Sequence, residues 1–220
     1  MRRKKMVIGI SVAVLAVLLG LFYVCCHGHA PASAPEGTRR LKGRALVVCY
    51  SQSNTKSTLT MGRWIQAVTG ADLMEIEPVT PYPEGYAATV KQAHGEIKNR
   101  FKPALKPFDK KAEEYDIVFL GTPVWFGTFA PPVRTFLAES NLSGKTVIPF
   151  CTHGGGGPSH TFSDLAAMLP DSTLLEGLAL RGPNVIQRKL GKGLESLSYP
   201  EDVTEWLLKL DLQWEDSGAK

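Results

Sequence analysis

Residues 45–56 read Ala-Leu-Val-Val-Cys-Tyr-Ser-Gln-Ser-Asn-Thr-Lys, an apolar run that changes abruptly into a polar one. The apolar half, Ala45–Tyr50, is short and wholly apolar, which is typical of a strand buried on both faces of a parallel sheet. After the polar half, Ser57–Thr69 has helical spacing, and Gly70 ends it. A strand, a polar turn and a helix in this order predict one unit of an α/β fold.

The same alternation continues to the end of the chain. Four more strands are predicted, at Leu73–Glu77, Asp116–Leu120, Thr146–Phe150 and Thr173–Leu180. The predicted helices are Tyr86–Asn99, Pro132–Glu139, Ser159–Leu169 and Glu201–Lys209, whereas Val185–Leu197 has no clear periodicity. Five strands alternating with helices predict an α/β fold with a doubly wound five-stranded parallel sheet and helices on both faces.

Ligands of such sheets bind beyond the carboxyl ends of the strands, so three loops are the places to search. The first, Ser51–Lys56, offers hydroxyls and backbone N–H groups at the start of a helix, which suits a phosphate monoester; simple helix capping by Ser53 or Asn54 is the alternative. The second, Gly121–Thr128, contains two adjacent aromatic residues that offer a flat surface to a planar ring. The third, Cys151–Pro158, has four consecutive glycines, which allow a backbone to approach a ligand closely.

These loops carry a family resemblance. Residues 47–56, 75–83, 121–127 and 149–155 are similar to the flavodoxin family, and more closely to its flavodoxin-like branch that is common in bacteria. The resemblance spans roughly residues 44–210 and implies a flavodoxin-like fold, FMN as cofactor and electron transfer as function. One departure is that the loop lacks the glycine that the family usually has between the positions of Ser53 and Asn54.

The resemblance also implies which residues bind the cofactor. The phosphate loop supplies Ser51, Gln52, Ser53, Asn54, Thr55 and Lys56, one wall of the flavin site supplies Pro123, Val124, Trp125, Phe126 and Gly127, and the other supplies Thr152, His153, Gly154 and Gly155. We expect Trp125 to favour oxidised flavin by stacking. We expect His153 and the N–H groups of Gly154 and Gly155 to favour reduced flavin by donating hydrogen bonds. No catalytic residue and no metal ligand is predicted.

Four of the 25 basic residues lie at positions 2–5, and residues 1–30 contain no acid, so the remainder is formally neutral with 21 basic and 21 acidic residues. This balance argues against nucleic-acid binding, which needs a basic face. The four cysteines show no metal-ligand spacing, and Cys49 and Cys151 are interpreted as small buried apolar residues.

Residues Met6–Cys26 form an uncharged apolar segment directly after the basic cluster, and its length suits a membrane span or a signal segment. The positive residues predict that the domain lies on the extracytoplasmic side. An uncleaved anchor, a lipoprotein using Cys25 or Cys26, and a secreted form all stay open. We therefore divide the chain into a signal or transmembrane segment (1–26), a flexible tether (27–43), a flavodoxin-like domain (44–212) and a tail (213–220).

Other functions are weighed against this one. Ser143–Thr146 resembles part of a nucleotide P-loop but precedes a strand, and the esterase-like His153–Gly156 has no accompanying G-x-S-x-G elbow. The alternatives left open are an NAD(P)H-dependent flavin or quinone reductase and a flavin-free binding module on the same fold. No separate nicotinamide-binding signature is present, and redox partner proteins are not identifiable from the sequence.

Overall fold

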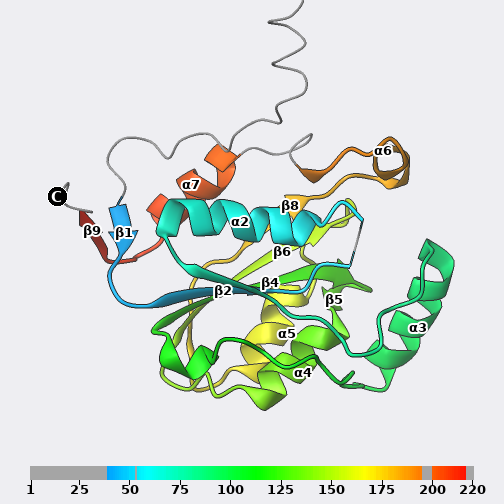
Figure 1. Ribbon diagram of the computed structural model, residues 1–220, viewed down its shortest axis with the longest axis horizontal. Coiled ribbons are helices and arrows are strands. Elements are labelled where there is room, and N and C mark those ends of the chain that lie inside the picture. Colours follow the sequence, from blue (N-terminus) through cyan, green and yellow to red (C-terminus); the bar gives the residue numbers. More distant parts are fainter. Residues whose placement is uncertain (1–38, 53, 195–199, 217–220) are drawn as a thin grey trace, which may run out of the picture. The chain divides into compact units, whose positions relative to one another are not determined.

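The computed structural model describes residues 39–52, 54–194 and 200–216 (Figure 1). The apolar segment 6–26, most of the tether and Ser53 lie outside the described residues. Among the helices that are described, none combines the length and the apolar composition required to cross a membrane.

A parallel sheet forms the centre of the domain. Its strands lie in the order β3 (Asp72–Glu75), β2 (Ala45–Cys49), β4 (Ile117–Trp125), β6 (Thr146–His153) and β7 (Thr173–Leu174). Every neighbouring pair on this path is parallel. All five residues of β2 are buried, as expected for a strand covered on both faces. The order reverses between β2 and β4, so the predicted doubly wound α/β fold is confirmed.

The sheet contains seven strands rather than the predicted five, because the last predicted strand is divided in two and a short hairpin strand is added. The last position is divided into β7 and β8 (Leu178–Arg181), both parallel to β6. Val147 is paired with Leu174 and Phe150 with Leu178, so this side advances four residues while β6 advances three. The interruption lies opposite Pro149, which has no N–H group to donate to a neighbouring strand.

The other addition is β5 (Thr128–Phe129), which forms an antiparallel hairpin with the end of β4. This hairpin and the pairing of Pro123 with Thr152 extend β4 and β6 beyond their predicted ends. Residues 121–125 and 151–153, predicted as loops, are therefore strand, because backbone pairing overrides their turn-like composition.

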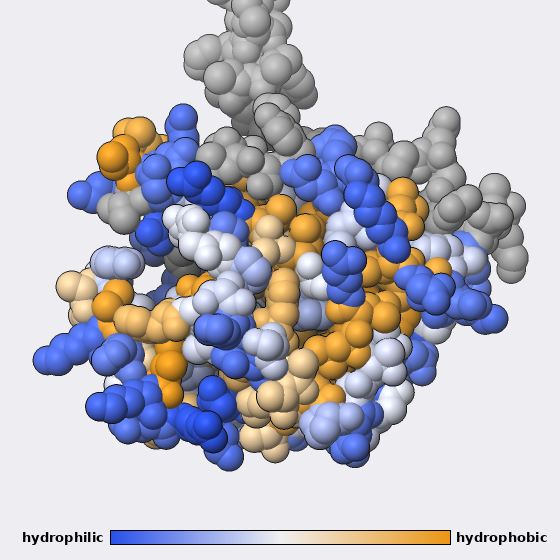
Figure 2. Space-filling model, turned by 180° about the vertical axis from the view of Figure 1, so that it is seen from behind, coloured by the Kyte–Doolittle hydropathy of each residue, from blue (hydrophilic) through white to orange (hydrophobic). Residues whose placement is uncertain are grey.

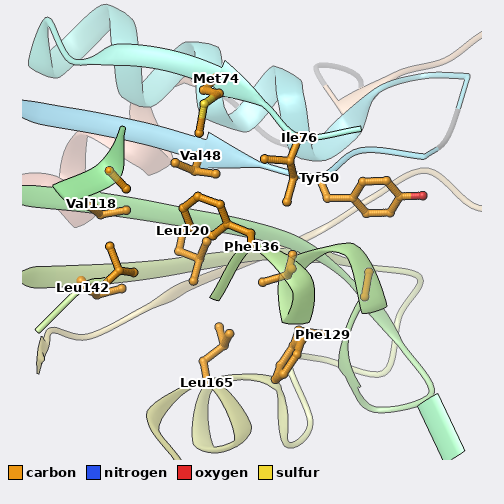
Figure 3. Packing of buried hydrophobic residues seen from close by; sticks show 14 of the residues in the cluster. Val48, Tyr50, Met74, Ile76, Val118, Leu120, Phe129, Phe136, Leu142 and Leu165 are labelled. Atoms are coloured by element: carbon orange, nitrogen blue, oxygen red, sulfur yellow. The ribbon is translucent and has the colours of Figure 1, made fainter. Parts of the chain in front are cut away.

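Helices cover both faces of the sheet (Figure 1). One face carries α2 (Ser57–Thr69) and α7 (Pro200–Lys209); the opposite face carries α4 (Pro131–Glu139) and α5 (Thr161–Met168). In Figure 3, Val48 and Leu120 point from the sheet toward Phe136 and Leu165 of the second layer. The remaining helices are α3 (Tyr86–Lys98), α6 (Val185–Lys189) and the short 3-10 helix η1 (Ala112–Glu114).

Two segments assigned to the tether and the tail belong to regular structure. Strand β1 (Arg39–Leu41) pairs antiparallel with β9 (Trp214–Asp216). Leu41 is buried, and Trp214 packs against the same apolar cluster as α2 and α7. The domain therefore extends beyond the predicted limits of 44 and 212, because these two apolar side chains add to its core.

Candidate functional site

A cleft of about 820 Å³ lies at the carboxyl ends of the central strands. Figure 2 shows the molecule hollowed at the edge where α3 and α6 lie. The volume falls within the usual range of sites for cofactors and other small ligands. Four segments line the cleft: the β2–α2 loop with the start of α2, the segment from Tyr82 to Ala93, the end of β4, and the end of β6 with the segment after β8.

The first lining segment is rich in hydroxyl groups. Ser51, Ser57 and Thr58 are all buried and all line the cleft. Lys56 precedes α2 in a left-handed conformation, with φ of 45°, and its side chain makes no capping hydrogen bond to the helix. Capping by Ser53, the alternative interpretation of this loop, lies outside the described residues and stays open. A helix start surrounded by hydroxyls is suited to bind an anion.

Two predicted phosphate-loop residues do not line the cleft. The Lys56 ammonium donates to Glu75 Oε1 at 2.6 Å and to the Ser51 carbonyl at 3.0 Å. Thr55 Oγ1 lies 3.2 Å from Ser57 Oγ. Gln52 and Asn54 line the cleft as predicted. The Lys56 side chain turns away because Glu75, at the end of the neighbouring strand β3, offers it a carboxylate partner.

An aromatic cluster forms part of the cleft wall. The Trp125 ring meets Tyr82 edge to face, with ring centroids 5.0 Å apart, and Tyr50 in the same manner at 5.7 Å. The Tyr82 hydroxyl donates to the Glu96 carboxylate, and the Tyr50 hydroxyl donates to Gln52 Oε1. Trp125 is half-buried and is held by these neighbours, so its position in the wall is defined before a ligand arrives.

Phe126 and Gly127 form the two-residue turn between β4 and β5. Both have positive φ, 50° and 79°, as a type I′ hairpin requires. A phenylalanine is rarely found in this conformation. Phe126 is 52% exposed and lines the cleft, and its ring centroid lies 5.1 Å from that of His94. Gly127 supplies the turn and does not line the cleft.

His153 organises the glycine-rich loop. Its Nδ1 accepts hydrogen bonds from the N–H groups of Gly155 and Gly157, both at 3.1 Å. Burial and the nearby Arg181 charge lower the pKa of His153 below its usual value. With Nδ1 acting as acceptor, the neutral ring carries its proton on Nε2. In this structure the Gly155 N–H therefore donates to His153, and its donation to flavin stays a prediction.

The remaining predicted residues fall into two groups. Pro123, Val124, Thr152 and Gly154 line the cleft, whereas Gly155 does not. Thr152 Oγ1 lies 2.8 Å from Thr58 Oγ1, which joins the end of β6 to the first turn of α2. Cys49 and Cys151 are buried, and burial raises the pKa of Cys151 to about 12, so both behave as small apolar residues, as interpreted.

Sequence reasoning missed part of the lining. The missed residues are Ser57, Thr58, Tyr82, Pro83, Glu84, Gly85, Tyr86, Thr89, Val90, Ala93, Gly182, Pro183, Arg188 and Lys189. Tyr82 and Pro83 belong to a stretch that carries the family resemblance, which was a usable signal. The residues after β8 carried no such signal, because nothing in their local sequence pattern indicates which surface they face.

The comparisons with known proteins agree with this geometry. The family model for flavodoxin matches residues 44–197. A candidate flavoprotein of Bacteroides eggerthii is 26% identical, with 76% of this chain and 96% of that chain covered and a TM-score of 0.61. A second candidate flavoprotein, from Bacteroides uniformis, is 24% identical, with 76% of this chain and 99% of that chain covered and a TM-score of 0.63. A Lactobacillus acidophilus flavoprotein in complex with FMN is 22% identical, with coverages of 63% and 93% and a TM-score of 0.56; it supports the fold alone.

Proposed function

Because the chain belongs to the flavodoxin family, we propose that its cleft binds FMN and that the protein is an electron carrier on the outer side of a membrane. The observation that carries the proposal is that two chemically different sets of groups line one cleft. Hydroxyls at a helix start form the first set, and an aromatic wall together with His153 forms the second. A phosphate fits the first set, and a flat ring with hydrogen-bonding edges fits the second.

Each set of groups would hold a different part of the cofactor. Ser51, Ser57 and Thr58 would hold the phosphate with hydroxyls and the N–H groups at the start of α2. Trp125 and Phe126 would cover the ring, and His153 would donate from Nε2 to a ring acceptor. Bound FMN supplies reversible uptake and release of electrons; the protein tunes that chemistry through these contacts.

A carrier is favoured over a self-sufficient reductase because the sequence contains no separate nicotinamide-binding signature. Electrons would then arrive from a partner protein and leave to another. The reductase and the flavin-free module make different predictions in one experiment.

The test is titration of the full-length protein, purified in detergent, with FMN and with riboflavin, followed by absorbance and flavin fluorescence. We expect FMN to bind far more tightly than riboflavin, which lacks the phosphate. A protein that binds neither is the flavin-free module. Steady oxidation of NADH or NADPH by the FMN-loaded protein, without a partner, would identify the reductase.

We also propose that residues 6–26 hold the domain at the membrane and that the domain is exported. Support comes from the uncharged segment and the four basic residues directly before it. A periplasm-dependent reporter fused after Lys220 should be active, while a cytoplasm-dependent reporter at the same position should be silent. Cytoplasmic activity, or complete release of the protein from membranes by a salt wash, would contradict this proposal.

A further inference from the structure

The segment after β8 lies against the start of α2, where the phosphate would bind. The Gly182 N–H donates to the His153 carbonyl at 2.8 Å. A Cβ atom placed on Gly182 would lie 3.8 Å from Ser57 Oγ. Gly182 and Ser57 both line the cleft. In Figure 1, α6 follows directly and lies beyond the first turn of α2.

The orientation of α6 is set at both of its ends. Asn184 Oδ1 accepts from the Gln187 N–H, and Gln187 Oε1 accepts from the Asn184 N–H, each at 2.9 Å. This reciprocal capping box defines where the helix begins. The Lys192 N–H donates to the Gln187 carbonyl, and Gly191 has φ of 70°, which ends the helix tightly. Arg188 and Lys189 are carried on this short, closed turn and line the cleft.

A bound phosphate would need more positive charge than the start of α2 supplies. A phosphate monoester carries about −1.5 to −2 charge at pH 7, whereas a helix start supplies only about +0.5. The single cation of the β2–α2 loop, Lys56, is paired with Glu75. Within the described part of the chain, Arg188 and Lys189 form no ion pair, and Glu84 is the one acidic residue that lines the cleft.

We propose that Arg188 and Lys189 provide the positive charge of the phosphate subsite, so that α6 selects FMN over riboflavin by charge. This inference rests on the proposed binding of FMN. It assigns a cationic role to α6, which lies about 130 residues after the phosphate loop in the chain. Lys56 of that loop is paired with Glu75. The shortened loop would then act together with a second element instead of holding the phosphate alone.

The experiment compares the full-length protein with the double variant Arg188→Gln and Lys189→Gln. Both side chains are exposed, so the fold should tolerate the change. The matched control is Lys42→Gln with Lys111→Gln, which removes the same charge from exposed positions outside the cleft lining. Dissociation constants for FMN and riboflavin are measured at low and high NaCl concentration.

We expect the double variant to bind FMN about tenfold or more weakly, since each lost charged hydrogen bond has an effect of that order. Riboflavin affinity should stay within about twofold of wild type, and the salt dependence of FMN binding should largely disappear. The control should match wild type. Unchanged FMN affinity in the double variant, or an equal loss for riboflavin, overturns this inference while leaving FMN binding intact. Failure of the wild type to bind FMN overturns the proposed function itself.

Discussion

Replacing His153 tests whether one side chain holds the glycine-rich loop. In His153→Ala, the N–H groups of Gly155 and Gly157 lose their shared acceptor, Nδ1. Each hydrogen bond contributes about 0.5–1.5 kcal/mol, and Gly155 is exposed, so water replaces part of what is lost. We therefore expect the free energy of unfolding of the flavin-free protein to fall by about 1–2 kcal/mol.

Two further variants separate the two nitrogen atoms of the ring. In His153→Asn, Oδ1 takes the place of Nδ1 and keeps an acceptor for the loop, but no donor replaces Nε2–H. In His153→Gln, a donor near the Nε2 position is kept, but the loop loses its acceptor. We expect the asparagine variant to retain most of the stability and the glutamine variant to resemble alanine. Urea unfolding measures the stability, and hydrogen exchange of the Gly155 and Gly157 amides reports the loop directly.

The pH dependence gives an independent check. Burial and the Arg181 charge lower the pKa of His153, so the unfolded chain takes up this proton more readily than the folded protein. The contribution of His153 to stability is therefore complete above pH of about 6.5 and is lost as the pH falls toward the lower folded-state pKa. His153→Asn should remove this part of the pH dependence. If His153→Ala unfolds at the same urea concentration as wild type, or if asparagine is as damaging as alanine, the role assigned to Nδ1 is refuted.

Three other changes test different parts of the molecule. Gly121→Ala should destabilise the protein by about 3 kcal/mol or more in urea unfolding, because its Cβ would lie 2.2 Å from Phe150 Cζ; wild-type stability would mean that Phe150 moves aside freely. Lys56→Met should change FMN affinity by less than about twofold and stability by less than about 1 kcal/mol, since Lys56 pairs with Glu75 at a partly exposed site; a large loss of FMN affinity would return Lys56 to the phosphate subsite. Trp125→Ala should raise the midpoint potential of bound FMN by about 10–30 mV, the equivalent of one stacking contact; an unchanged potential in potentiometric titration would show that Trp125 serves the aromatic cluster alone.

Local pattern was sufficient for most of the architecture. The helix predicted at Ser57–Thr69 has the same bounds as α2, because apolar spacing and the terminating Gly70 are both local signals. The run Ala45–Tyr50 contains the buried strand β2, which its continuous apolar composition predicted. Since parallel strands bring their carboxyl ends to one edge of a sheet, the three loops after them could be assigned to one cleft before their contacts were known.

The contacts of individual side chains required the tertiary structure. Lys56 belongs to the polar loop in sequence, yet its ammonium binds Glu75, and only the pairing of β2 with β3 brings that carboxylate within reach. The sequence alone suggests that the Gly155 N–H group faces a ligand, whereas in the structure this group donates to His153 Nδ1. In both cases, the choice of partner depends on distances between groups that composition and periodicity do not encode.

The alternation of strands and helices, the family and the edge of the sheet where the cleft lies could all be predicted from local sequence, because hydrophobic periodicity and turn residues act over a few neighbouring positions. The folded protein was needed to see that β1 pairs with β9 and that Arg188 and Lys189 line the same cleft as Ser51. Both arrangements bring together segments that are far apart in the chain. They depend on how whole elements pack against one another, and packing is a property of the folded chain rather than of any short stretch within it.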